Sequence, residues 1–347
     1  DALGLLKAGP DSAGAVPGPV AYGRGGTEPT ITDADFALGF LSPIGFAGGA
    51  IDVDIPASQA ALDDLAQQAG LSSEKLAWGI HDLVNENMAS AARVHVAEKG
   101  RDPRNYTLVP TGGAGPVHAY YLARKLGIKR IVCPRNAGVA SALGLLLAPA
   151  RVDRTAAFAA AIDDLDWAEL ETTYQDLESA ARQVIVDTGM DSATARVQRL
   201  ADMRNVGQGF ELVVNLPTGP YSGDSHDGLL AAYAQAYQAR FTRPPPNVPV
   251  TLAAIRVRLT APVDTSMDNF DQDGASALKG QREVYFPETD GVADAAIYNR
   301  AAMKIGDVHT GPAVVEEAES TMVIGPGGKF HISANGNLII DLPKDTA

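Results

Sequence analysis

This sequence has little cysteine, a shortage of positive charge and no long apolar run, and each shortage excludes a class of protein. Cys133 is the only cysteine in 347 residues, so no internal disulfide can form, and we expect a reducing compartment, the cytoplasm. Lys and Arg total 28 against 42 Asp and Glu, and no basic stripe appears, which argues against nucleic-acid binding. No apolar run reaches about 18 residues, so we expect no membrane-spanning helix.

Motifs that would identify a self-contained catalytic or metal site are also missing. The sequence has no G-x-x-x-x-G-K-[ST] loop, no G-x-S-x-G, no H-E-x-x-H and no C-x-x-C, so it identifies no catalytic residue. His81 and His95 share one expected helix but lie too far apart along its axis to bind one ion, and we expect no metal site built from this chain alone. Cys133 precedes a proline in an expected buried strand, which predicts an inert thiol.

The length and composition predict a globular protein of about two domains. The start, Asp1-Ala2-Leu3-Gly4, is neither a methionine nor a signal peptide, and we expect it to lie inside a longer protein. The first 50 residues are dense in glycine and proline and predict a well-ordered loop. We expect a domain over 1–150, a connecting helical segment over 151–194 and a β-rich domain over 195–347.

The clearest helix is predicted after Ser72, which is a good N-cap, and before Gly100, which is a good stop. Between them, apolar residues recur at helical spacing from Leu76 onward. Glu86 and Arg93 fall on or near the opposite face, and the simplest interpretation of that face is exposure to solvent.

A strand, a glycine cluster, a helix and a second strand are predicted next, over 106–111, 112–115, 116–126 and 129–134. A strand, helix, strand unit is normally parallel, and its ligands bind at the carboxyl ends of the strands. The glycine cluster lies at that end. The following run, 138–148, predicts a buried helix.

The cluster Gly112, Gly113, Ala114 and Gly115 allows backbone to approach a ligand closely, and the helix behind it presents unpaired N–H groups. Both properties favour a nucleotide or another anion, although a plain tight turn has the same sequence pattern. His118 lies in the first turn of that helix, where the helix dipole disfavours a charged imidazole, and we expect it to be neutral.

Two further polar clusters have ordinary structural explanations. Glu316, Glu317 and Glu319 lie at an expected strand end, where solvation explains them better than catalysis does. Arg24, in "GRGGTEPT", has the chemistry to bind an anion, but a structural turn explains the same residues.

Four segments, taken in chain order, resemble the hydantoinase A and 5-oxoprolinase family of ATP-dependent enzymes. They are "SAGAVPGPVAYGRGGTEPTITDADFALG", "LVPTGGAGPVHAYYLARKLGIKRIVCPRNAGVASALGLLLA", "DMRNVGQGFEL" and "GPAVVEEAESTMVIGPG". The family includes N-methylhydantoinases, a caprolactamase and subunits of acetone and acetophenone carboxylases. One departure is Asn205, which stands where the family usually has an aromatic residue.

The resemblance implies an α/β actin-like ATPase (ribonuclease H-like) half-domain followed by a C-terminal mainly β (α+β) domain. Carried over, Gly112, Gly113, Ala114 and Gly115 would line the ribose and adenine of ATP, and Glu86 and Arg93 gain a possible contact with the ribose.

Family members are about twice as long as this chain, and their N-terminal halves carry the glycine-rich loops that hold the phosphates and the metal. Neither loop is visible here. The resemblance therefore implies that ATP and Mg bind with phosphate and metal ligands from outside this chain. Those ligands would come from the missing N-terminal half or a separate subunit, with a hydantoinase B-type subunit as a further partner.

The function implied is a part of an ATP-dependent hydrolase of a cyclic amide, such as a hydantoin, oxoproline or lactam. ATP would phosphorylate the amide oxygen and so make a poor electrophile reactive. A ketone carboxylase subunit that uses the same phosphorylation is the close alternative. A non-catalytic assembly subunit that keeps the fold is the alternative from another class.

Overall fold

The computed structural model describes residues 6–262, 276–289 and 291–343. The chain forms two compact units, which we treat separately. Unit 1 combines Asp1–Gly144 with Met267–Ala347, and unit 2 is the intervening Leu145–Ser266. The first four residues, on which the expectation of an internal start rests, lie outside the described residues.

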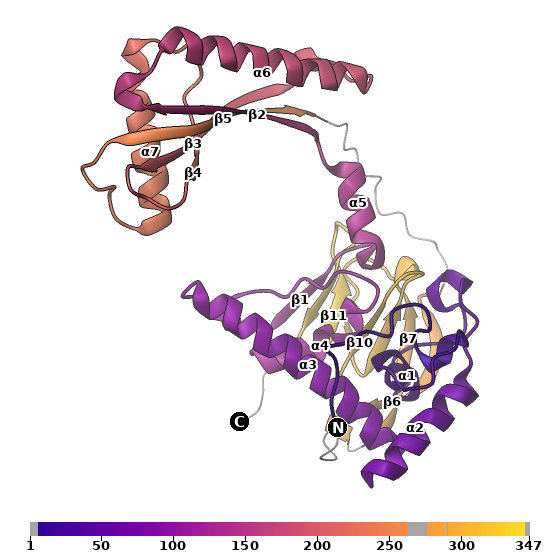
Figure 1. Ribbon diagram of the computed structural model, residues 1–347. Coiled ribbons are helices and arrows are strands. Elements are labelled where there is room, and N and C mark those ends of the chain that lie inside the picture. Colours follow the sequence, from indigo (N-terminus) through magenta and orange to yellow (C-terminus); the bar gives the residue numbers. More distant parts are fainter. Residues whose placement is uncertain (1–5, 263–275, 290, 344–347) are drawn as a thin grey trace. The chain divides into compact units, whose positions relative to one another are not determined.

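Figure 1 labels most of the principal helices and strands. The α-helices are α1 (Ile31–Ala37), α2 (Ile55–Ala69), α3 (Ser73–Glu98), α4 (Gly115–Leu126), α5 (Ala140–Leu147), α6 (Trp167–Asp187) and α7 (His226–Phe241). The strands are β1 (Arg130–Cys133), β2 (Ala150–Ala161), β3 (Arg196–Asn205), β4 (Leu212–Asn215), β5 (Val250–Ala261), β6 (Leu278–Phe286), β7 (Gly291–Asn299), β8 (His309–Thr310), β9 (Ala313–Glu316), β10 (Thr321–Ile324), β11 (Lys329–Ile332) and β12 (Leu338–Asp341).

Unit 1 contains two four-stranded sheets, with strand orders β1-β12-β11-β8 and β10-β9-β7-β6. In the first, the strand after α4 pairs antiparallel with the last strand, so that Ile131 faces Ile340. In the second, β7 and β9 run parallel. The helices of unit 1 pack beside these sheets around one apolar core, in which Tyr120, Phe286 and Phe330 are fully buried (Figure 1).

Helix α3 confirms the clearest prediction from the sequence. The Ser72 side chain accepts a hydrogen bond from the Lys75 N–H at its start, and Gly100 follows its end with φ +64°. The helix packs against α1, α2 and α4, and its apolar residues, including Leu76 and Ile80, enter the core of unit 1. The crossing with α4 is what brings polar residues of the two helices together.

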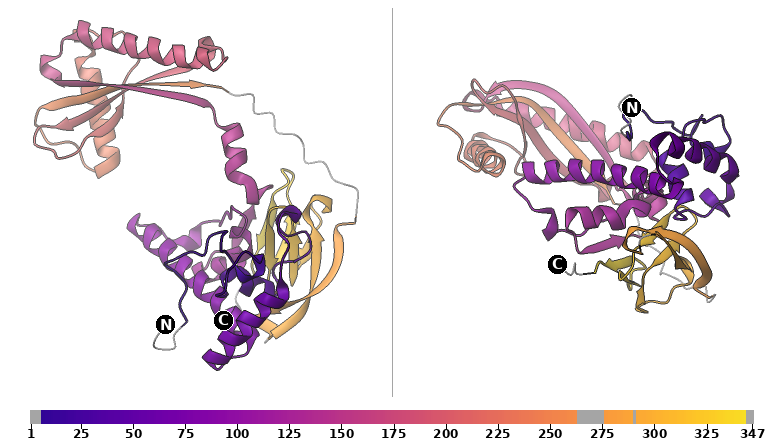
Figure 2. Two further views of the ribbon diagram at one scale, coloured as in Figure 1. Left: turned by 45° about the vertical axis from the view of Figure 1, so that its right-hand side comes forward. Right: turned by 90° about the horizontal axis from the view of Figure 1, so that it is seen from below.

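Unit 2 is a four-stranded antiparallel sheet of order β2-β5-β3-β4 with two helices. Helix α6 packs along β2 and β5, and α7 packs beside β4, as Figures 1 and 2 show. Its separate apolar core includes Tyr174, Tyr233 and Leu259.

The compact units differ from the division expected along the sequence. The β-rich domain expected over 195–347 is split, because β3, β4 and β5 form the sheet of unit 2 whereas β6 to β12 belong to unit 1. The segment 151–194 does not simply connect domains, since it supplies β2 and α6 to unit 2. Short strands separated by turns indicate β structure but carry no information about which strands pair. For this reason the sequence analysis placed all of these strands in one domain.

Two local predictions also need correction. The strand expected over 106–111 is reduced to one parallel bridge between Leu108 and Ile131, although the order bridge, helix, strand is kept. The buried helix expected over 138–148 is helical as α5, but none of its residues is buried. Apolar composition shows what a helix can bury, not whether a partner covers it. Among the helices of the described ranges, none is both long and apolar enough to cross a bilayer.

Candidate functional site

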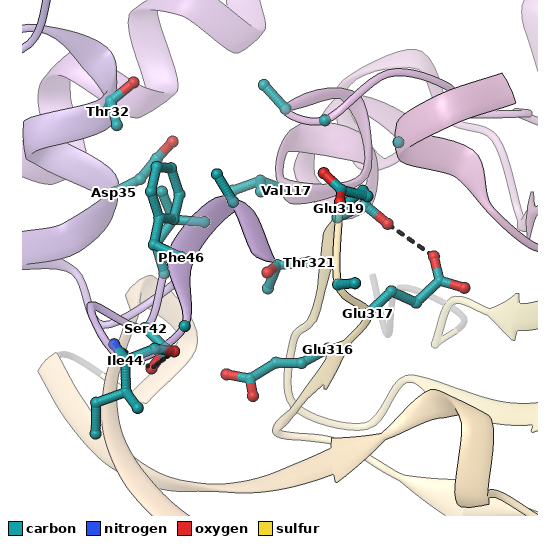
Figure 3. A pocket seen from close by; sticks show the side chains of 18 of the residues that line it. Thr32, Asp35, Ser42, Ile44, Phe46, Val117, Glu316, Glu317, Glu319 and Thr321 are labelled. Atoms are coloured by element: carbon teal, nitrogen blue, oxygen red, sulfur yellow. Dashed lines mark hydrogen bonds between the residues drawn. The ribbon is translucent and has the colours of Figure 1, made fainter. Parts of the chain in front are cut away.

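A cavity of about 650 Å³ lies within unit 1. Most of its lining comes from three groups of residues: α1 with the loop up to Ile51, the glycine turn with the start of α4, and the turn between β9 and β10. Gly138, Ser276, Lys279 and Asn299 complete it. Figure 3 shows Thr32 and Asp35 on one side of this cavity and the glutamates of the β9–β10 turn on the other. The volume falls in the range of small-molecule sites, about 300 to 1,000 Å³.

The glycine cluster forms the turn that was predicted, immediately before α4. Gly112 has φ +87°, in the left-handed region that favours glycine, and its N–H donates to the Ala137 carbonyl over 2.8 Å. Ala114 is the N-cap of α4, and no side chain caps it. Gly113 and Ala114 line the cavity. The glycine turn and the start of α4 therefore border a space in which a ligand fits, although Pro116 has no N–H and the Val117 N–H donates to the Ala114 carbonyl over 3.1 Å.

Gly113 and Gly138 both line the cavity, but they differ in whether a side chain would fit at their position. A Cβ on Gly138 would lie 2.2 Å from the carbonyl oxygen of Glu319, so this position has no room for a side chain. A Cβ on Gly113 would lie 3.5 Å from the same oxygen, an ordinary contact, and Gly113 is not among the glycines of positive φ. A substituent on Gly113 therefore meets no strain of its own and extends beside a cavity that this residue lines.

Glu316, at the end of β9, and Glu317, in the β9–β10 turn, line the cavity and are held by cations, so solvation, which the sequence analysis favoured, is the wrong explanation for these two. Glu316 pairs with Lys279 and accepts a hydrogen bond from Arg282 over 3.0 Å. Glu317 lies 3.1 Å from a guanidinium nitrogen of Arg300. Glu319 is exposed but belongs to the same wall.

Arg300 ties this turn to β1 from a buried position. Its guanidinium donates to the carbonyl oxygens of Cys133, Pro134 and Gly336 over 2.8 to 3.0 Å. Burial raises the pKa of the Cys133 thiol to about 11, so the thiol stays protonated at neutral pH. The prediction of a buried core cysteine is confirmed.

Two buried aspartates of α1 have different surroundings. Asp33 is saturated: its carboxylate accepts from the backbone N–H groups of Val20, Ala21 and Thr30 and from the Thr30 and Ser58 hydroxyls, over 2.7 to 3.2 Å. Asp35 lines the cavity and accepts a hydrogen bond from His81 Nδ1 over 2.7 Å. Asp33 therefore has a structural role, whereas Asp35 lines a cavity in which a ligand fits.

Asp35 belongs to a polar cluster that the sequence analysis missed. Asp35, His81 and His118 are buried, and each offers a ligand atom within 4.8 Å of the other two. The rings of His81 and His118 stack with centroids 4.5 Å apart, and His118 Nδ1 donates to Asn85 Oδ1 over 3.0 Å. Burial lowers the pKa of His118 to about 4, which agrees with the neutral imidazole expected there.

The sequence analysis compared His81 with His95 as ligands of one ion, because both lie on α3. The relevant neighbour of His81 is instead His118, on α4, and the third member comes from α1. No spacing within one element predicts such a cluster. Two features of the sequence point toward this cluster: a histidine on an expected helix, in a chain with only six histidines, and the two aspartates of the T-D-A-D segment.

Glu86 and Arg93, which the resemblance suggested as ribose contacts, lie outside the lining of this cavity. Arg93 pairs with Glu86 over 2.8 Å and donates to the Lys125 carbonyl over 2.7 Å, and Lys125 pairs with Glu86 over 3.2 Å. The two residues thus join α3 to the C-terminal end of α4. A contact with a ribose stays a prediction.

Two family models match the chain. The model described as Hydantoinase/oxoprolinase matches residues 1–154, and the model described as Hydantoinase/oxoprolinase C-terminal domain matches residues 163–338. Caprolactamase subunit alpha from Pseudomonas jessenii is 33% identical over 96% of this chain and 49% of its own length.

Solved structures give the same assignment. The ATP-dependent caprolactamase of Pseudomonas jessenii matches with a TM-score of 0.73 and 31% identity, over 98% of this chain and 50% of that one. A nucleotide-free acetone carboxylase, described with ATP-dependent acetone carboxylation, matches with a TM-score of 0.83 and 25% identity, over 97% of this chain and 49% of that one. This chain spans about half the length of these caprolactamase and acetone carboxylase chains, and it belongs to the hydantoinase/oxoprolinase family.

Proposed function

We propose that this chain is part of an ATP-dependent enzyme that opens a cyclic amide, and that its glycine turn binds the adenosine half of ATP. The observation that carries the proposal is the uncapped start of α4, with Gly113 and Ala114 beside a cavity of about 650 Å³. Two relatives support it, since both are described as ATP-dependent and one of them as a caprolactamase. An actin-like ATPase half-domain is the fold that we propose for this part of unit 1.

The charges around the cavity favour adenosine over the phosphates as its occupant. Asp35, Glu316, Glu317 and Glu319 line it, and Lys279 is the cation among the described lining residues. Carboxylates accept hydrogen bonds from ribose hydroxyls and from the adenine amine, but they repel a triphosphate. The phosphates and Mg would then be held by loops outside this chain, on the N-terminal half of the family chain or on another subunit.

The proposed reaction activates an amide that is by itself a poor electrophile. The terminal phosphoryl group of ATP is transferred to the amide oxygen, and water adds to the amide carbon. The ring C–N bond then breaks as the nitrogen takes a proton, and the acyl phosphate that remains is hydrolysed by a second water. A hydantoinase B-type subunit is the proposed partner for the hydrolytic steps.

A ketone carboxylase subunit is the second candidate, because the acetone carboxylase structure matches this chain with the higher of the two TM-scores, 0.83 against 0.73. The two candidates share the phosphorylation of an oxygen and differ in what attacks next. The test is therefore a substrate comparison in the complete assembly, in which ADP release is measured with hydantoin, oxoproline, caprolactam or acetone with bicarbonate. Release that depends on a cyclic amide supports the proposal, and release that depends only on the ketone replaces it with the second candidate.

The glycine turn is tested by Gly113→Val with Gly113→Ala as its matched control. The valine methyl groups extend beside a cavity that Gly113 lines, whereas an alanine Cβ makes only an ordinary contact. We expect ATP affinity, measured by calorimetry on the complete assembly, to fall at least about tenfold for Val, or 1.4 kcal/mol, and to change little for Ala. Unchanged ATP affinity in a folded Gly113→Val assembly would show that the glycines hold only the turn, and absence of ATP binding in the native assembly would favour a non-catalytic assembly subunit.

A further inference from the structure

The carboxylate of Asp35 has far fewer hydrogen bonds than that of its neighbour Asp33. Asp33 accepts five, whereas Asp35 accepts one, from His81 Nδ1 to Oδ1. Among the described residues, no donor reaches Asp35 Oδ2 and no lysine or arginine pairs with this side chain. Burying a carboxylate with most of its lone pairs unused is costly, so a ligand that supplies donors is favoured here.

Asp35 lies at the cavity, next to the start of α4. It is only 3% exposed, yet it lines the cavity, and Figure 3 shows it beside Thr32 on the α1 side of that space. A carboxylate oxygen of Asp35 lies within 4.8 Å of a ring nitrogen of His118, which belongs to the first turn of α4. Gly113 and Ala114 line the same cavity and directly precede that turn. Asp35 therefore lies near the wall to which we assign the adenosine.

His81 holds the Asp35 side chain in one orientation. Its ring is fully buried and stacked between Trp78 and His118, with centroids 5.6 and 4.5 Å away, and its Nδ1 donates to Asp35 Oδ1 over 2.7 Å. The other ring nitrogen, Nε2, has no partner among the described residues. An unpaired buried nitrogen is destabilising and needs an explanation, and positioning the Asp35 carboxylate for a ligand provides one.

His118 does not neutralise Asp35. Its Nδ1 donates to Asn85 Oδ1 over 3.0 Å, and burial lowers its pKa to about 4, so the ring is uncharged at neutral pH. The first turn of α4 favours a negative charge through the helix dipole, but none of its described N–H groups donates to Asp35. Asp35 therefore offers the cavity a hydrogen-bond acceptor that suits O–H or N–H donors.

We propose that Asp35 accepts hydrogen bonds from the 2′- and 3′-hydroxyls of the ribose of ATP, and that His81 positions it for this contact. The inference rests on the proposed function, in which the cavity binds the adenosine half of ATP. A vicinal diol directs two donors at one carboxylate, and acidic side chains bind ribose hydroxyls in dinucleotide-binding folds. The adenine amine is a poorer match, because its two hydrogens point apart and one carboxylate meets only one of them.

The test compares nucleotides on the complete assembly by calorimetric titration. The nucleotides are ATP, 2′-deoxyATP, 3′-deoxyATP and ITP, in which a carbonyl replaces the adenine amine. For the native assembly we expect each deoxynucleotide to bind at least about tenfold more weakly than ATP, because each has lost a hydrogen bond to a charged group. This comparison does not depend on the folding of any variant.

Asp35→Asn assigns the discrimination to one residue, since it keeps an oxygen that accepts from His81 but removes the charge. We expect ATP affinity to fall at least about tenfold and the difference between ATP and the deoxynucleotides to shrink to within about threefold, with the ratio of ATP to ITP affinity unchanged. Asp64→Asn, the same substitution at an exposed aspartate of α2, is the matched control and should keep the native affinities. Thermal melts establish that both variants are folded.

His81→Phe tests the positioning role, because it keeps an aromatic ring in the stack and removes the N–H that holds Asp35. We expect it to reduce the discrimination against deoxynucleotides as well. Lower stability with unchanged discrimination would limit His81 to packing and would overturn its assigned role.

The outcomes separate this inference from the proposed function. If ATP binds but the native assembly does not discriminate against deoxynucleotides, or still discriminates in folded Asp35→Asn, the ribose contact is wrong and the ATP site stands. A change in the ATP-to-ITP ratio alone would also overturn it, by assigning Asp35 to the adenine amine. Absence of ATP binding to the native assembly would overturn both.

Discussion

The two units each contain a cluster of charged and polar side chains, buried in unit 1 and partly buried in unit 2, and the two clusters differ in how completely their atoms are paired. In unit 2, Arg199 donates to Glu171 and Glu178 over 2.6 to 3.0 Å and lies over the rings of Tyr174 and Tyr221. In unit 1, His81 Nε2 has no hydrogen-bond partner among the described residues, and its neighbours Asp35 and His118 line a cavity. A cluster that satisfies itself stabilises its unit, whereas one that leaves buried atoms unpaired is suited to a ligand.

The largest effect is expected from removing the cation of the unit 2 cluster. Arg199→Met leaves Glu171 and Glu178 mostly buried without their partner, since their side chains are only 15% and 22% exposed. We expect a loss of about 3 to 5 kcal/mol in the unfolding free energy of unit 2, measured by hydrogen exchange of its peptides. Arg204→Met, which breaks the exposed pair with Glu211, is the control and should cost less than about 1 kcal/mol. Equal losses would contradict the idea that burial makes this cluster structural.

The second effect separates the neighbouring aspartates of unit 1. Asp33→Ala strands the N–H groups of Val20, Ala21 and Thr30, and we expect it to destabilise unit 1 by about 3 kcal/mol. Asp35→Asn should change the stability of unit 1 by less than about 1 kcal/mol, because the amide oxygen can still accept from His81. Thermal melts of the two variants make the comparison. A larger loss of stability for Asp35→Asn than for Asp33→Ala would show that Asp35 has the structural role.

The third effect is a pH dependence confined to unit 2. The Arg199 guanidinium beside Glu171 holds the pKa of that carboxyl near 2, below its ordinary 4.5. Because the folded-state pKa is the lower one, this stabilisation is complete above pH 4.5 and is lost as the pH falls toward 2, by on the order of 2 to 3 kcal/mol. Glu171→Gln should flatten this part of the stability curve, followed by hydrogen exchange of unit 2. An unchanged slope would show that Glu171 is not the group that titrates.

The smallest effect concerns the glycines of the cavity wall. Gly138→Ala places a Cβ against the Glu319 carbonyl, and the backbone must shift, so we expect unit 1 to lose about 1 to 3 kcal/mol. Gly113→Ala makes only an ordinary contact and should stay within about 0.5 kcal/mol of the native protein. Urea unfolding of the two variants gives the difference. If neither variant loses stability, the backbone of the cavity wall can shift to make room for a Cβ, which would contradict the expectation from close packing.

Sequence reasoning succeeded where local chemistry decides the structure. Helix α3 has apolar residues at a strong helical period and a capping residue at each end, so its own residues predict it. The glycine turn before α4 likewise has a backbone conformation that its own residues determine. Sequence reasoning missed β2, because this strand is rich in alanine and has few of the β-branched residues that mark a strand.

The polar cluster was out of reach for a different reason. Asp35, His81 and His118 come from three elements, and they meet because α3 packs against both α1 and α4. Spacing along one helix can exclude a shared ligand for two of its own residues, as it did for His81 and His95. It says nothing about residues that a helix crossing brings together, and such sites need the tertiary structure.

The antiparallel pairing of β1 with β12 also sets the order in which the protein can fold during synthesis. Unit 2 is continuous in sequence, so all of its strands have left the ribosome before β12 is made. Unit 1 must wait for β6 to β12 before Ile131 can meet Ile340, and until then the apolar faces of α3 and α4 lack their sheets. The first part of unit 1 must therefore wait for partners that follow unit 2 in the chain, although it is translated before unit 2.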